Sequence, residues 1–185
     1  MPLAYLAGPD VFLPDAPAHA ARKTAICAAH GITALPPLNE DLATLASMAE
    51  AEAWRAIFAK DLGLMESADL VIANLTPFRG PSADAGTLIE VGWFLGRGKP
   101  VFGYSNAAEP FAERSRRQVE AVPDPLPGLA VEGFGLPDNL MIAGAVEASG
   151  HSILLPEEGR DLAFDSLEVF TRCVAVAAAA LRGPG

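Results

Sequence analysis

The 185-residue chain is poor in the residues on which metal sites, disulfides and nucleic-acid surfaces depend. It has 2 cysteines, Cys27 and Cys173, and 3 histidines, and none of them has the spacing of a metal site. We therefore expect no bound metal and two buried, apolar cysteines. Lys and Arg number 13 against 23 Asp and Glu, a formal net charge of −10. This balance argues against nucleic acid or an anionic membrane surface as a partner, because both attract basic proteins.

Long apolar runs and several well-known motifs are also missing. No stretch reaches the roughly 18 uncharged apolar residues of a membrane span. The start lacks a basic region followed by an apolar one, so we expect no signal peptide and a cytoplasmic protein. There is no G-x-G-x-x-G, no Walker-type loop and no G-x-S-x-G elbow. We therefore expect no cofactor, and side-chain carboxylates become the candidates for chemistry.

The chain does contain a regular alternation of short apolar segments and longer amphipathic ones. The short segments predict five strands, at 3–7, 32–35, 69–75, 100–104 and 152–155. The longer ones predict helices, at 16–30, 50–67, 86–96, 139–149 and 161–181, with a short helix near 109–119. This alternation predicts βαβ units. The expected fold is α/β, with a flavodoxin-like, doubly wound, five-stranded parallel sheet and helices on both faces, in a single domain over residues 1–185.

Sheets of this kind bind ligands beyond the carboxyl ends of their strands. The loops after Ala7, Leu75 and Tyr104 are therefore the expected site of function. The segment Ser105–Pro137 is long for a connection and holds a Pro-rich run at 123–127. A functional loop and a solvated excursion both remain open for it.

Asp61 is the first carboxylate that does not fit a surface role. It shares one stripe of the expected helix with three apolar residues: Trp54, Phe58 and Met65. A carboxylate on an apolar face is costly unless something compensates it. Two interpretations stay open, an acid in a partly dry site or a buried ion pair with Arg55 or Arg79.

Glu90 and Asp84 are two further candidates. Glu90 is the single charge in an apolar helix, and Thr87 three residues earlier matches a capping box, in which Glu90 would only reach a backbone N–H. Alternatively, Glu90 is a carboxylate whose ionised form the helix field favours and which acts as a nucleophile. Asp84 is either an ordinary residue near a helix start or a second acid facing Glu90. Converging carboxylates suit glycosyl transfer with retention.

Four blocks of the sequence, in this order, resemble the nucleoside 2-deoxyribosyltransferase family. They are Tyr5–Phe12, Phe58–Asp69, Asn74–Gly92 and Glu132–Met141. The third block holds Asn-Leu-Thr-Pro-Phe-Arg-Gly, and the last, Phe-Gly-Leu-Pro-Asp-Asn-Leu-Met, is most similar to trypanosomatid members. No block suffices alone, but the four together cover most of the chain.

The resemblance implies an enzyme of purine and pyrimidine salvage that transfers 2-deoxyribose between bases, with deoxynucleosides and free nucleobases as its ligands. Glu90 would form a covalent deoxyribosyl ester at C1′ with overall retention of the β configuration, and Asp61 and Asp84 would be acids at the base. The implied substrate-binding residues are Tyr5, Asp10, Phe12 and Asn139. Asn139 would come from a neighbouring subunit, which implies a homodimer or a higher homo-oligomer.

Two other functions stay open. A hydrolase of deoxynucleosides or deoxynucleotides on the same fold would let water intercept the ester, although the turn Gly8-Pro9-Asp10 supplies an acid where a phosphate site favours basic or Ser-rich loops. A non-catalytic nucleoside-binding module would use Glu90 only as a cap. Some family members place a C-terminal carboxylate in an active site, whereas the end of this chain, Leu181–Gly185, has two glycines and a proline, and we expect it to be frayed.

Overall fold

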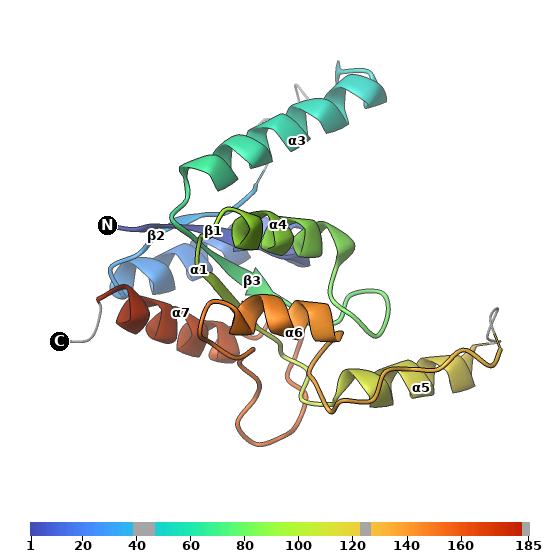
Figure 1. The fold of residues 1–185 in the computed structure, drawn as a ribbon. Helices are drawn as coiled ribbons and strands as arrows, with labels where there is room; N and C mark the ends of the chain where they lie inside the picture. Colours follow the sequence, from blue (N-terminus) through green and yellow to red (C-terminus); the bar gives the residue numbers. More distant parts are fainter. Residues whose placement is uncertain (39–46, 123–126, 183–185) are drawn as a thin grey trace.

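The computed structural model of the protein describes residues 1–38, 47–122 and 127–182. Its strands are β1 (Leu3–Ala7), β2 (Thr33–Leu35), β3 (Leu70–Asn74) and β4 (Val101–Tyr104). Its helices are the 3-10 turn η1 (Pro9–Phe12), α1 (Ala16–Ala29), α3 (Glu50–Ser67), α4 (Ala85–Gly96), α5 (Phe111–Ala121), α6 (Leu140–Glu147) and α7 (Glu168–Leu181). Strands alternate with helices along most of the chain, so the predicted α/β class is confirmed (Figure 1).

The described strands form one parallel sheet in the order β2-β1-β3-β4. The prediction of a fifth strand at 152–155 is wrong, because only Leu154 pairs, in an isolated bridge with Tyr104. The Leu154 N–H donates to Gly103 O at 3.0 Å and its carbonyl accepts from Ser105 N at 2.9 Å. The next donor along this ladder would be Pro156, which has no N–H, so the pairing ends after one residue.

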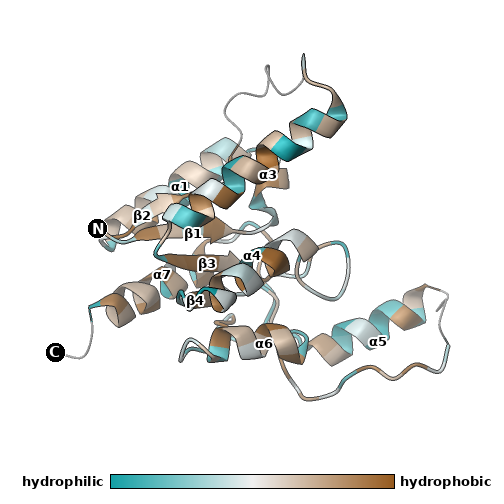
Figure 2. Ribbon diagram, turned by 45° about the horizontal axis from the view of Figure 1, so that its top comes forward, coloured by the Kyte–Doolittle hydropathy of each residue, from teal (hydrophilic) through white to brown (hydrophobic). Residues whose placement is uncertain are grey.

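The strands bury both faces, and alternate residues point to opposite layers. On one face, strand residues such as Leu6 and Ile72 pack against α1 and α7. On the other, Tyr5 and Val71 pack against α4 and α6. Figure 2 shows the apolar strands enclosed between these helices. Helices therefore cover both faces, as predicted, and both cysteines are buried and free.

The last helix begins later than the sequence predicts, at Glu168 rather than at 161. The preceding residues wrap around Asn106. The Asn106 side-chain amide donates to the carbonyls of Ala163, Phe164 and Ser166 at 3.0–3.2 Å, and the Asn106 backbone carbonyl accepts from Leu162 N at 2.8 Å. Backbone groups that bind this amide are not available to the first turn of a helix.

The N-terminal half of α3 extends away from the sheet (Figure 1). Met65 near its other end is buried, whereas Trp54 is 56% exposed and Phe58 is 60% exposed. The predicted apolar stripe is therefore buried only at its C-terminal end. None of the described helices is both long and apolar enough to cross a membrane.

Candidate active site

A cavity of about 510 Å³ lies beyond the carboxyl ends of the strands, where the chain crosses from one side of β1 to the other. Its walls come from the loops after β1 and β2, from the starts of α1 and α4, and from the middle of α3. The lining residues are Gly8, Val11, Phe12, Leu13, Ala16, Pro17, Pro37, Leu38, Ile57, Asp61, Asp84, Thr87 and Glu90. All three candidate acids thus meet in one cavity, although they come from two helices and a helix cap.

Asp84, and not Thr87, caps α4. The Asp84 carboxylate accepts from Thr87 N at 3.0 Å and from Thr87 Oγ1 at 3.2 Å, and the helix begins at Ala85. Thr87 is therefore the third helical residue and Glu90 the sixth, so the capping-box interpretation of Glu90 is wrong. The interpretation of Asp84 as a residue at a helix start is confirmed, and the same side chain lines the cavity; its part as a second acid stays a prediction.

The Glu90 side chain is held by a residue of the central sheet. Tyr5, fully buried on β1, donates its hydroxyl to Glu90 Oε1 at 2.6 Å. Burial raises the pKa of Glu90 to about 7; the Tyr5 hydrogen bond lowers it, and the charges of Asp61 and Asp84 raise it. The sequence argument that the helix field keeps Glu90 ionised is thus wrong, because that field is strongest in the first turn and Glu90 lies in the second.

Tyr5 acts as a neutral donor in this pair. Burial raises its pKa above the ordinary tyrosine value, and the negative charge of Glu90 raises it further. The hydroxyl proton therefore stays on Tyr5 over the working range of a protein. One Glu90 oxygen is engaged by this proton, and the carboxylate itself ionises close to neutral pH.

Asp61 is half-buried on α3, and its Oδ1 atom is buried without a hydrogen-bond partner among the described residues. Burial raises its pKa, and Lys60 lowers it. Neither arginine proposed from the sequence forms a described ion pair with it: Arg55 lies over the Trp54 ring and Arg79 over the Phe78 ring. A polar oxygen left unsatisfied at a cavity wall is costly to folding and is typical of a ligand-binding group.

The four expected substrate-binding residues lie in different places. Tyr5 lies under Glu90, and Phe12 lines the cavity with a 65% exposed side chain whose ring stacks on Phe78, with centroids 5.6 Å apart. Asp10 lies outside the lining of this cavity. Asn139 also lies elsewhere, since it caps α6 and donates to Glu132 Oε2 at 2.7 Å.

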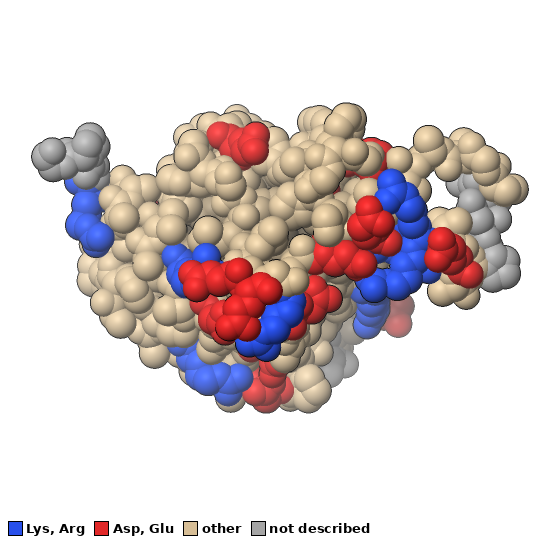
Figure 3. All heavy atoms as spheres, turned by 90° about the horizontal axis from the view of Figure 1, so that it is seen from below, with Lys and Arg blue, Asp and Glu red and all other residues tan. Residues whose placement is uncertain are grey.

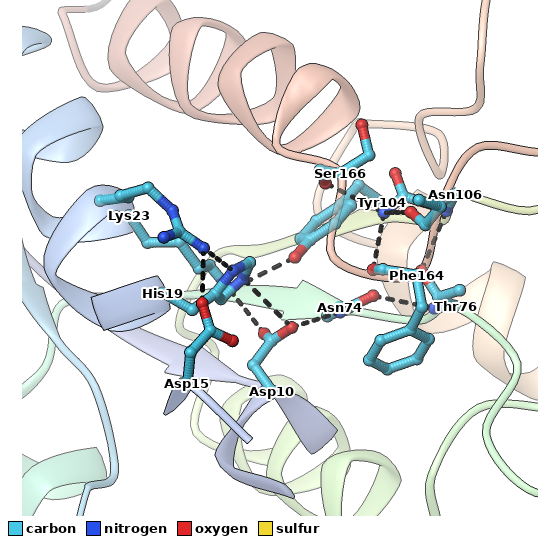
Figure 4. A network of polar contacts seen from close by, with 12 residues as sticks. Asp10, Asp15, His19, Lys23, Asn74, Thr76, Tyr104, Asn106, Phe164 and Ser166 are labelled. Carbon is cyan, nitrogen blue, oxygen red and sulfur yellow. Dashed lines mark hydrogen bonds and ion pairs between the residues drawn. The ribbon is translucent and has the colours of Figure 1, made fainter. Parts of the chain in front are cut away.

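Asp10 belongs to a polar network that the sequence analysis missed (Figure 4). Its carboxylate pairs with Lys23 Nζ at 2.7 Å, accepts from Asn74 Nδ2 at 2.9 Å and lies 3.6 Å from His19 Nε2. Lys23 is 2% exposed, and its ammonium group also donates to the Tyr104 hydroxyl at 3.3 Å. The network therefore joins the ends of β1, β3 and β4.

Lys23 could have been found by the reasoning that identified Asp61. It shares one helical stripe with three buried apolar residues: Ala16, Ala20 and Cys27. The loop after Tyr104, which the sequence predicts to be part of the site, enters this network: Asn106 N donates to Thr76 Oγ1 at 2.9 Å. Among the described residues, that loop contributes none to the cavity lining. It contacts the residues that follow β3 instead.

A family model for nucleoside 2-deoxyribosyltransferase matches residues 4–141. The chain belongs to this family. The match contains every expected site residue, and the prediction of the family from the sequence is confirmed. Within the described residues, no group of three or more His, Cys, Asp or Glu side chains is arranged to hold a metal ion.

Individual relatives extend over most of the chain. The solved structure of a 2-desoxiribosyltransferase from Leishmania mexicana has 29% identity and a TM-score of 0.62, covering 94% of this chain and 97% of its own. The solved structure of a conserved protein from Enterococcus faecalis V583 has 18% identity and a TM-score of 0.53. The match covers 96% of this chain and 99% of that chain, and it shows the fold alone. An uncharacterised protein of Schizosaccharomyces pombe is 29% identical over an alignment of 167 residues, with a coverage of 81% of this chain and 79% of that protein. Family and fold together indicate a nucleoside 2-deoxyribosyltransferase-like function.

Proposed function

We propose that the protein transfers 2-deoxyribose from one purine or pyrimidine base to another through an ester on Glu90. The observation that supports this most is the cavity that Glu90 shares with Asp61 and Asp84, with the Tyr5 hydroxyl holding the Glu90 carboxylate. A retaining glycosyl transfer needs one carboxylate as nucleophile and another acid for the leaving group. The three carboxyl side chains that line the cavity can take these two parts.

In the first step, an ionised Glu90 oxygen attacks C1′ of the deoxyribose. The bond from C1′ to the base nitrogen breaks, its electron pair stays with the base, and an acid in the cavity protonates the base. Asp61 suits this part, because burial raises its pKa and favours the protonated form. The products are a deoxyribosyl ester of Glu90 and a neutral base.

In the second step, a nitrogen of the incoming base attacks the same carbon. The ester C–O bond breaks, its electrons return to the Glu90 carboxylate, and the proton lost by the base goes back to the acid. Two inversions at C1′ restore the β configuration. Tyr5 stabilises the carboxylate when it leaves, and the exposed ring of Phe12 offers a face on which a base can stack.

The reaction products distinguish this proposal from the alternatives. The protein is incubated with 2′-deoxyinosine with and without adenine, and bases and nucleosides are separated by chromatography. Deoxyadenosine that appears only when adenine is present supports transfer. Equal release of hypoxanthine without adenine would establish a hydrolase, and binding without turnover would establish a nucleoside-binding module.

Asp61→Asn tests the acid directly. We expect kcat to fall by about 10²–10⁴-fold, the usual range for loss of a general acid. The fold is kept, because Asn has the size of Asp and cannot carry the charge that burial disfavours. Glu66→Gln, an exposed acid on the same helix, is the matched control and keeps wild-type activity. An Asp61→Asn chain that fails to fold would show that Asp61 has a structural role.

We also propose that the active form is a homodimer or higher homo-oligomer in which Asn139 completes the site of a neighbouring subunit. Within this chain Asn139 lies outside the cavity lining. Large exposed apolar side chains follow it in the sequence, Leu140 at 42% and Met141 at 73%, and two more, Phe58 at 60% and Ile89 at 73%, are sequence neighbours of the cavity residues Ile57 and Glu90. Burying such side chains stabilises association.

Mixing two inactive variants tests this arrangement. After subunit exchange, a Glu90→Ala chain and an Asn139→Ala chain form mixed dimers in which one of two sites has both native residues. We expect roughly a quarter of wild-type activity, from the statistics of a symmetric dimer. A mixture that stays inactive although mass spectrometry shows mixed dimers would refute a role for Asn139 in the neighbouring site.

A further inference from the structure

Asp138 is a fully buried carboxylate that the proposed reaction does not use. It is 1% exposed and lies outside the cavity lining. Its Oδ1 accepts from Ser82 Oγ at 2.5 Å and from Asn139 N at 2.8 Å, and its Oδ2 accepts from Ala83 N at 2.9 Å. One side chain therefore ties together two segments that are 55 residues apart in sequence.

Arg114 of α5 holds the same two segments. Its guanidinium donates to Pro81 O at 2.8 Å, to Pro137 O at 2.6 Å and to Glu109 O. Burial lowers the pKa of Arg114. Among the nearby charges that raise this pKa, Asp138 has the largest effect. Arg114 and Asp138 thus bind neighbouring positions on both segments.

The other arginines of α5 differ from Arg114. Arg116 and Arg117 are exposed and pair with Glu113 and Glu109. On the face shown in Figure 3, many of the basic side chains lie beside acidic ones. Arg114 is only 7% exposed and binds backbone carbonyls instead. Arg114 therefore links the backbone at Pro81 to the backbone at Pro137 inside the protein.

The segment that Asp138 holds leads directly into Asp84. Ser82 and Ala83 are the two residues before Asp84, and their loop has little regular structure of its own. It is closed by one described hydrogen bond from Phe78 N to Ser82 O at 3.0 Å, and Arg79 takes a positive φ of 55°. Asp138 thus fixes the two residues that lead into Asp84, while Thr87 binds the Asp84 carboxylate itself from the side of α4.

We propose that Asp138, braced by Arg114, is a positioning residue that sets the placement of Asp84 in the cavity and fixes the Asn139 backbone relative to it. The functional part of this proposal rests on the role proposed above for Asp84. A purely stabilising role explains less, because the cost of desolvating a buried charge offsets much of what its interactions contribute to stability. The three hydrogen bonds that Asp138 accepts, from Ser82, Ala83 and Asn139, instead restrict the backbone next to Asp84 and at Asn139.

A double-mutant cycle tests the proposal. In Asp138→Asn the amide has one oxygen and one NH2 group, so it cannot accept from all three donors. We expect kcat/KM of the folded enzyme to fall about 10–100-fold in the native background, and less than about 3-fold in an Asp84→Asn background, because residues that act through one another are not additive. Equal losses in the two backgrounds would overturn the proposal, as would a lower melting temperature with unchanged kcat/KM.

Titration of Glu90 provides a readout that does not need turnover. The charge of Asp84 raises the pKa of Glu90, so Asp84→Asn lowers it. If Asp138 positions Asp84, Asp138→Asn changes the Glu90 pKa in the wild-type background and leaves it unchanged in the Asp84→Asn background, as measured by carboxyl carbon NMR. That pattern in a protein without transferase activity would refute the proposed function but uphold the positioning role. A Glu90 pKa that Asp138→Asn leaves unchanged in the wild-type background overturns the positioning role.

Two further variants make the cycle decisive. Ser82→Ala removes one of the three bonds and is the milder change if Asp138→Asn does not fold; we expect a smaller loss of kcat/KM with the same dependence on Asp84. Asp69→Asn is the matched control, because Asp69 accepts from Leu3 N at 2.8 Å at the opposite end of the sheet. It is expected to lower stability without changing kcat/KM.

Discussion

Replacing Glu90 with Ala lowers the rate of base exchange by roughly 10³-fold or more, because the proposed nucleophile is lost. The fold is retained, since Asp84 and not Glu90 caps α4. The measurement is kcat with 2′-deoxyinosine and adenine, beside far-ultraviolet circular dichroism of the same sample. A folded Glu90→Ala protein that keeps its activity would refute the proposed mechanism.

Glu90 also makes stability and activity depend on pH in opposite directions. Its pKa is about 7 in the folded chain and 4.5 as an unperturbed group. Between these values the folded state holds a proton that the unfolded state has released, so stability falls as the pH rises from about 4.5 to 7. Activity rises over the upper part of the same range, because the nucleophile must be ionised.

Glu90→Gln separates the two effects. The neutral amide has no charge to desolvate, so we expect the variant to be inactive yet more stable than the wild type at pH 8, on the order of 2 kcal/mol after allowing for partial solvent exposure. At pH 4 the two proteins have similar stability. Urea unfolding at both pH values provides the comparison, and equal stability at pH 8 would contradict the raised pKa.

Replacing Lys23 with Met lowers the free energy of unfolding by about 3–5 kcal/mol, because it leaves the Asp10 carboxylate, 13% exposed, without its ammonium partner. Urea unfolding at pH 8 measures this loss. At this pH His19, whose pKa burial lowers, is neutral and cannot replace the lost charge. The changes Lys23→Met and Asp10→Asn together are expected to recover much of the loss, because no buried charge then lacks a partner.

Arg22→Met is the matched control for Lys23→Met. Arg22 is the preceding residue on α1, and its ion pair with Asp15 has side chains that are 49% and 51% exposed. Exposed pairs of this kind contribute at most about 1 kcal/mol. A Lys23→Met chain no less stable than the Arg22→Met chain would show that the network around Asp10 contributes little to stability.

The candidate carboxylates show which site residues can be predicted from the residue spacing within one helix. Asp61 was found because a charge on an apolar stripe is visible within a few turns of one helix. Glu90 was found in the same way, but the capping box assigned to it was wrong, because the helix begins at Ala85 and its cap is Asp84. Lys23 carried the same signal as Asp61 and was missed. The single domain over residues 1–185 stays a prediction, and the C-terminal tail at 183–185 and most of the Pro-rich run at 123–127 lie outside the described residues.

The sequence by itself determined the family, through four blocks that resemble it. It also determined the α/β class and the location of most helices and strands, because periodicity and capping act between residues a few positions apart. Only the tertiary structure decided which side chains meet: Tyr5 with Glu90, Lys23 with Tyr104, and Ser82 with Asp138, pairs that are 85, 81 and 56 residues apart. It also decided that the segment 152–155 pairs through Leu154 alone and that Asp10 faces Lys23. Such contacts depend on the order and register of parallel strands, which place distant residues at one edge of the sheet and leave no local pattern in the chain.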